Sequence, residues 1–141
     1  DRTTVWFIRM SLIYLLVGAV TGVLMLTAPR YIVYYLPVHS HIMVFGWVTM
    51  LIFGVGYHIL PRFSGQQIWS QGLFRATFWL ANVGVIGMAV FWAFSRRNPE
   101  SAAMASLLGV FGIIAFVGIL CFIINMLKTI KPAEGIQPPA R

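Results

Sequence analysis

Four apolar stretches, each near the length of a membrane-spanning helix, constrain the fold of this chain more than any other feature. They cover residues 5–27, residues from His39 or His41 to the residue before Pro61, residues 73–94 and residues 102–127. About 20 apolar residues in a helix cross ~30 Å of hydrocarbon. The chain is 60% hydrophobic and 9% charged, which is more apolar surface than a soluble domain can bury. We therefore predict an all-α fold, an integral membrane four-helix bundle.

Short segments that combine proline or glycine with a charge separate the four stretches. They are residues 28–30, 61–65 and 95–100, and such segments end helices. We predict one four-helix transmembrane domain over residues 1–130 and a flexible C-terminal tail over residues 131–141. The chain starts with Asp1 instead of methionine, so we expect it to lack its own start.

The basic residues predict how the bundle is oriented in the lipid bilayer. Four spans place both termini and the loop between the second and third spans on one side. That side holds Arg2, Arg9, Arg62, Arg75, Lys128, Lys131 and Arg141, whereas the other side holds Arg30, Arg96 and Arg97. Because short loops rich in lysine and arginine stay in the cytoplasm, we predict that both termini are cytoplasmic.

The chain carries few groups for acid–base chemistry. Its three acidic residues, Asp1, Glu100 and Glu134, lie outside the apolar stretches, and no Ser/His/Asp set, phosphate loop or HExxH motif is present. Hydrolysis, phosphoryl transfer and ion pumping are therefore disfavoured. The basic residues flank the spans and form no cluster, so the net charge of +7 does not predict a nucleic acid partner.

All three histidines belong to the second apolar stretch, with His39 and His41 at its start and His58 at its end. Imidazole binds many metals, including heme iron in membranes, so these three are the candidate metal ligands. At about 100° per residue, His39 and His41 point almost oppositely and cannot share one iron. His58 lies 17 residues beyond His41, or ~25 Å along a helix, so one cofactor cannot touch both ends, although two cofactors could.

Other interpretations of these residues stay open. The histidines could hydrogen-bond to water or lipid headgroups at the interface, or His39 and His41 could bind copper with a third ligand. The predicted face of His39 also holds Met43 and Gly46, with Gly54 close by, and offers recesses. Small residues such as the Gly18 and Gly22 pair favour close helix packing, with room for a flat cofactor as the alternative.

Residues 39–61 begin with HSHIMVFGW and end with YHILP. This segment resembles the second helix of subunit I of the heme–copper oxidase superfamily, including the large subunit of nitric oxide reductase. It is most similar to short four-helix homologues of oxidase subunit I, which share an H-x-H-x(4)-G-W pattern and a closing Y-H-x-x-P. The other spans match that family only in being apolar.

The resemblance implies that a histidine at the outer end of the second helix ligates the iron of heme b. Val38-His39-Ser40 fits the start of the family helix, whereas counting back from Trp47 places the ligand between His39 and His41. The recessed face favours His39. The further candidate contacts are Arg30 for the heme propionates and Gly46, Trp47 and Gly54 for the porphyrin.

The chain also departs from complete oxidases, which have some twelve helices and a second metal held by three later histidines. We therefore do not expect it to reduce oxygen or nitric oxide alone, and a second axial ligand must come from another copy, another subunit or a methionine. We predict a b-type cytochrome of a bacterial or archaeal inner membrane. It transfers electrons in a homo-oligomer or respiratory complex, with quinone as a candidate partner. The alternatives are a gas-binding heme sensor and a cofactor-free structural subunit.

Overall fold

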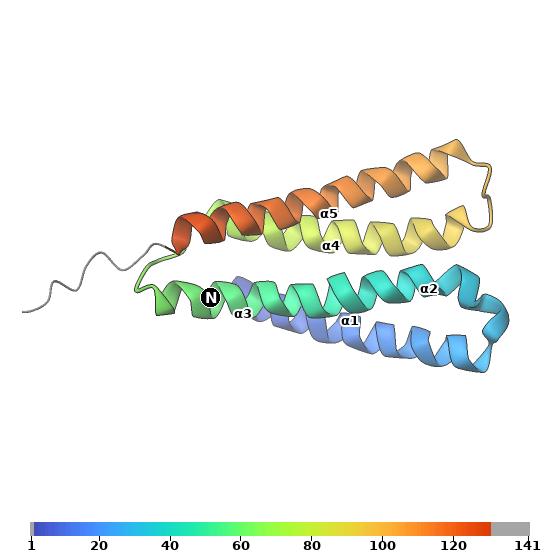
Figure 1. The fold of residues 1–141 in the computed structure, drawn as a ribbon, viewed down its shortest axis with the longest axis horizontal. Coiled ribbons are helices and arrows are strands. Elements are labelled where there is room, and N and C mark those ends of the chain that lie inside the picture. The colour runs from blue at the N-terminus through green and yellow to red at the C-terminus, as the bar shows by residue number, and fades with distance from the viewer. Residues whose placement is uncertain (1, 131–141) are drawn as a thin grey trace, which may run out of the picture.

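The computed structural model describes residues 2–130, which form four long helical rods (Figure 1). The second rod is continuous through three segments, of which the middle one is π-helical. In chain order the elements are α1 (Arg2–Thr27), η1 (Pro29–Tyr31), α2 (Ile32–His41), the π-helix η2 (Ile42–Thr49), α3 (Met50–Phe63), α4 (Gln71–Ser95) and α5 (Ala102–Thr129). The tail predicted for residues 131–141 lies outside the described residues.

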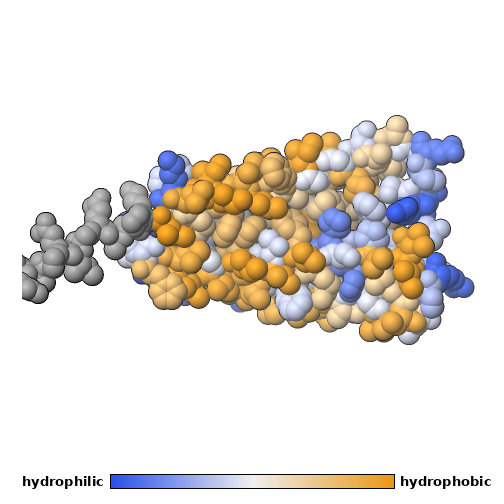
Figure 2. All heavy atoms as spheres, viewed as in Figure 1, coloured by the Kyte–Doolittle hydropathy of each residue, from blue (hydrophilic) through white to orange (hydrophobic). Residues whose placement is uncertain are grey.

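All four rods are long and apolar enough to cross a membrane. Figure 2 shows hydrophobic residues over the middle of the bundle and the most hydrophilic residues gathered toward its ends. Lipid-facing helices need such an apolar surface because hydrocarbon offers their side chains no hydrogen bonds. The prediction of an all-α integral membrane four-helix bundle is confirmed.

The predicted start of the second span is wrong. The span covers Pro29–Phe63, a length of 35 residues, and its α-helical part, α2, begins about two turns before His39. Pro37, which precedes the predicted start of the span, lies inside α2. A proline costs one main-chain hydrogen bond, and the apolar segment before it still favours a helix in lipid. His39 therefore lies ~10 Å along the helix from Ile32, and not at its first turn.

Glycines let the rods approach one another closely. A Cβ atom added at Gly84 of α4 would lie 2.6 Å from Cβ of Ala115, so α4 and α5 are in close contact there. On the second span, a Cβ atom added at Gly46 would lie 2.8 Å from Cγ of Tyr14. Close packing around small residues replaces the hydrophobic effect as the main source of helix association in lipid.

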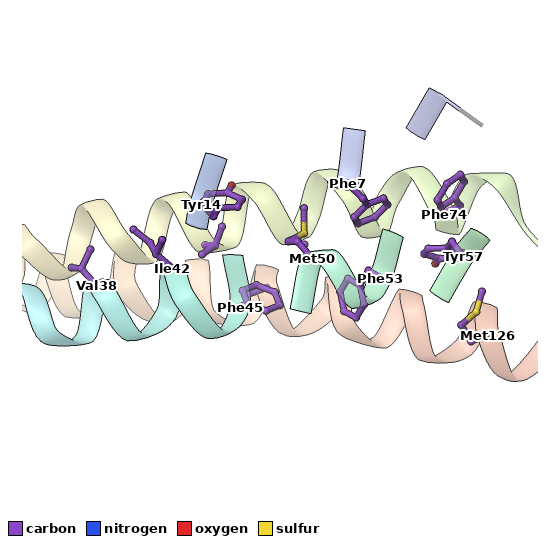
Figure 3. Packing of buried hydrophobic residues seen from close by; sticks show 13 residues of the cluster. Phe7, Tyr14, Val38, Ile42, Phe45, Met50, Phe53, Tyr57, Phe74 and Met126 are labelled. Atoms are coloured by element: carbon purple, nitrogen blue, oxygen red, sulfur yellow. The ribbon is translucent and has the colours of Figure 1, made fainter. Parts of the chain in front are cut away.

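Aromatic side chains fill the core between α1, α3 and α4 (Figure 3). Phe7 is fully buried and its ring centroid lies 5.9 Å from that of Phe74 and 6.0 Å from that of Tyr57. Tyr57 donates or accepts a 3.0 Å hydrogen bond with Thr77. This cluster fixes the relative positions of three helices at the end of the bundle opposite His39.

The helix ends follow local sequence signals. Ser70 caps α4 by accepting a hydrogen bond from the Leu73 amide, and Ser101 caps α5 by accepting one from the Met104 amide. After α3, Gly65 takes a left-handed φ of 60°. The amide of Gln66 then donates to the Pro61 carbonyl, a C-terminal motif that favours glycine at the left-handed position.

Candidate functional site

His39 is held against α1 by its ring nitrogen. Nδ1 lies 2.9 Å from the carbonyl oxygen of Gly18 and 3.2 Å from Oγ1 of Thr21. Because a carbonyl oxygen can only accept a hydrogen bond, Nδ1 carries the proton and donates it. The other nitrogen, Nε2, then carries the lone pair that an imidazole uses to bind a metal.

The surface of α1 under this ring is shaped to receive it. A Cβ atom added at Gly22 would lie 3.2 Å from Cε1 of His39, so any larger residue would press on the imidazole. Thr21 also donates its hydroxyl hydrogen to the Gly18 carbonyl at 2.8 Å. We call Gly18, Thr21 and Gly22 the imidazole slot of α1.

His41 faces a different helix. Its Nδ1–H donates to the carbonyl of Pro37 in the same helix at 2.8 Å. Its ring lies 6.3 Å from the Trp92 ring of α4, tilted by 30°. His39 and His41 therefore face α1 and α4 respectively, in agreement with the prediction that they cannot bind one iron together.

Trp92 brings an unusual feature to the neighbourhood of His41. Its indole Nε1–H is buried, and within residues 2–130 it has no hydrogen-bond acceptor. The guanidinium of Arg96 lies 5.5 Å from the Trp92 ring. A buried donor without an acceptor costs free energy. A ligand that brings an acceptor to this position would therefore satisfy the Trp92 Nε1–H.

His58 lies on α3, near the far end of the second span, and is exposed. Arg62, one turn later, donates a hydrogen bond from Nη1 to Nε2 of His58. A shallow hollow of about 220 Å³ between α1 and α3 is lined by His58 together with Thr4 and Ile8. His58 is thus separate from the other two histidines.

The remaining predicted contacts lie apart from one another. Arg30 is in η1 at the end of the bundle, with its guanidinium 4.8 Å from the Tyr31 ring. Trp47 is half-buried in η2 and packs against the core. The recesses at Gly46 and Gly54 hold Tyr14 and Phe7 of α1. The cofactor contacts proposed for these four residues stay predictions.

Thr21 and Trp92 were not among the predicted site residues. The small residues Gly18 and Gly22 were noted as a packing pair, and a threonine between them is the signal that could have indicated an imidazole partner. Nothing in the sequence pairs Trp92 with His41. Among the described residues, no three His, Cys, Asp or Glu side chains gather into a metal site, so these residues offer single imidazoles.

Comparisons with known proteins identify the family of the chain. The sequence model of the family described as cytochrome C and quinol oxidase polypeptide I matches residues 1–96. The match includes α1, the second span and α4, and so extends beyond the second span on which the sequence resemblance rested. No solved structure matches the chain.

Two curated proteins are similar to the chain. One is the cbb3-type cytochrome c oxidase subunit CcoN1 of Stutzerimonas stutzeri, 41% identical over 56 residues, which are 38% of this chain and 12% of that protein. The other is the probable cytochrome c oxidase subunit 1-alpha of Streptomyces coelicolor, 27% identical over 143 residues, covering 89% of this chain and 24% of that protein. The chain thus spans at most about a quarter of the length of these relatives. Since the family model matches most of the chain, this membrane protein belongs to the cytochrome c and quinol oxidase polypeptide I family and is a partial homologue of subunit I of the heme–copper oxidases.

Proposed function

We propose that this chain is a membrane cytochrome subunit that holds heme b through His39 and takes part in electron transfer. Heme, when bound, supplies one-electron redox chemistry, and its potential depends on the axial ligands and the surrounding shell. The chain itself needs no buried acid or base for this function. A function of this kind is compatible with the apolar spans and with Glu100 as the single acidic residue within residues 2–130.

The observation that carries the proposal is the hydrogen bond between His39 Nδ1–H and the Gly18 carbonyl. Histidines that ligate metals usually donate their other ring N–H to a carbonyl or carboxylate, which fixes the tautomer and makes the ligand more basic. His41 makes a similar bond to Pro37, but within its own helix. His39 is oriented by a second helix and lies in a slot that fits its ring, so His39 is the residue that would hold the heme iron.

The His39 imidazole, with Nε2 free of the proton that Nδ1 donates, has the donor chemistry to hold heme iron. In the part of the chain that the structure describes, the other imidazoles face α4 or lie at the far end of the second span. We therefore propose that any further protein ligand to the iron would come from another copy of the chain or from another subunit. The relatives are cytochrome c oxidase subunits by name, which supports a place in a respiratory complex of the inner membrane.

The test is optical spectroscopy of the full chain purified from membranes. Reduced-minus-oxidised spectra and the pyridine hemochrome of the protein should show heme b, and carbon monoxide should leave the reduced spectrum of a six-coordinate heme nearly unchanged. A strong shift of the reduced spectrum on addition of carbon monoxide would indicate that the protein binds gas instead of transferring electrons. A folded protein without a Soret band would contradict the cytochrome proposal.

A further inference from the structure

A groove runs along the bundle between α1 and α4. It consists of two adjoining hollows of about 450 Å³ and about 380 Å³. Both hollows are lined by Trp6, Phe78 and Trp79, so they form one continuous depression, which we call the α1–α4 groove. Phe7 lies beneath it, with its ring edge-on to that of Phe78 at 5.1 Å.

The inner section of the groove is apolar. Besides the shared aromatic residues it is lined by Met10, Ile86 and Asn82. The amide of Asn82 is already engaged, because its Oδ1 accepts the Tyr14 hydroxyl hydrogen at 2.7 Å and its Nδ2 donates to the Phe78 carbonyl at 2.7 Å. A ligand in this section would therefore contact hydrocarbon and sulfur atoms, and this apolar surface favours an acyl chain.

The mouth of the groove is positively charged. Arg2, the first residue of α1, and Arg75, in the second turn of α4, both line it. Neither arginine has an ion pair among residues 2–130, where the single carboxylate, Glu100, lies in the α4–α5 loop at the opposite end of α4. Trp6 and Trp79 flank the groove and are 48% and 66% exposed, as is common for tryptophans at a membrane interface.

We propose that the α1–α4 groove binds an anionic phospholipid, with its phosphate between Arg2 and Arg75 and one acyl chain along the apolar section. The two cations at the mouth, neither of which has an ion pair within residues 2–130, select an anion. A neutral quinone headgroup would provide neither with a counter-ion. The apolar section continues from the charged mouth toward the middle of the membrane, which matches the order of headgroup and chain in a lipid. The proposal uses no histidine, so it stands or falls separately from heme binding.

The test uses lipids with dibrominated acyl chains, which quench tryptophans in contact with them. The full chain in phosphatidylcholine nanodiscs is titrated with brominated phosphatidylglycerol or, separately, with brominated phosphatidylcholine. Each arginine near a membrane surface should raise the affinity for an anionic lipid about fivefold. The anionic lipid should therefore reach half-quenching at a mole fraction about 25-fold lower than that of phosphatidylcholine. Arg2→Gln and Arg75→Gln should each reduce this preference about fivefold, and Trp6→Phe with Trp79→Phe should remove most of the lipid-specific quenching.

Lys128→Gln is the matched control, because it removes one positive charge near the same end of the bundle, outside the groove. It should keep the preference. Equal quenching of the unsubstituted protein by both lipids, or a preference that survives the combined Arg2→Gln and Arg75→Gln substitutions, would overturn the proposal. A short-chain quinone that relieves the quenching equally in the protein with and without these arginines would overturn it in favour of a quinone site.

Discussion

Nδ1 of His39 lies 2.9 Å from the carbonyl oxygen of Gly18, so a main-chain group of α1 orients an imidazole of the second span. The bond uses the ring nitrogen that faces α1 and leaves Nε2 as the metal-binding atom. It also joins the first two spans about two turns inside the end of the bundle. The same contact thus contributes to helix packing and prepares the candidate ligand.

Replacing Gly22 with alanine should weaken heme binding. The new Cβ would lie 3.2 Å from Cε1 of His39, so the ring must shift by a few tenths of an ångström, which weakens its hydrogen bond to Gly18. Loss of such an orienting bond costs about 10- to 100-fold in metal affinity. Heme titration of the apoprotein measures this change. Gly109→Ala, which meets nothing within 4 Å, is the control and should bind heme as the unsubstituted protein does.

Replacing Gly84 with alanine should destabilise the packing of α4 against α5. Gly84→Ala would place Cβ atoms 2.6 Å apart, and overpacking of this kind costs about 1–3 kcal/mol. Unfolding in increasing mole fractions of sodium dodecyl sulfate, followed by circular dichroism, gives the free energy of unfolding. Gly112→Ala introduces the same methyl group into open space, and a loss of stability as large as that of Gly84→Ala would contradict the account.

Tyr14 of α1 and Asn82 of α4 should couple energetically. The Tyr14 hydroxyl donates to Asn82 Oδ1 at 2.7 Å, and this hydrogen bond is buried between the two helices. Hydrogen bonds between membrane helices contribute about 0.6 kcal/mol on average and up to about 1.7 kcal/mol. A double-mutant cycle with Tyr14→Phe and Asn82→Ala measures the coupling. Additive effects of the two substitutions would show that the bond contributes nothing to stability.

Asn125 should hold the loop between α3 and α4 in place. Its Oδ1 accepts the Ser70 amide hydrogen at 3.0 Å and its Nδ2 donates to the Ser70 carbonyl at 2.9 Å. Asn125→Ala leaves both main-chain groups of Ser70 without these partners, so amide hydrogen exchange of Ser70 should become faster. Asn98 makes its hydrogen bonds in the α4–α5 loop through its main chain, so Asn98→Ala should leave this exchange unchanged.

The number of spans and their helical nature could be predicted from apolar length alone, because lipid leaves the chain few other folds. The ends of α1, α4 and α5 agree with the predicted stretches to within a few residues. The start of the second span could not be predicted in this way, because a proline inside a helix, such as Pro37, gives the same sequence signal as a proline before one. In the structure the apolar residues before Pro37 are helical, and α2 begins at Ile32.

The partners of the histidines could be predicted only in part. Helical spacing indicated correctly that His39 and His41 face different neighbours. The face that Gly46 and Gly54 share with His39 suggested recesses for a cofactor, yet side chains of α1 occupy both. Pairing of Gly46 with Tyr14 depends on the register between two helices, which an amphipathic pattern does not encode when all faces are apolar.

Heme content after histidine substitution tests the central claim most directly. The full chain and its His39→Ala, His41→Ala and His58→Ala variants are purified with equal helix content, and heme b per chain is measured as the pyridine hemochrome. We predict that His39→Ala loses its heme, whereas His41→Ala and His58→Ala retain it. Full heme content in His39→Ala, or loss of heme in His58→Ala alone, would contradict the account.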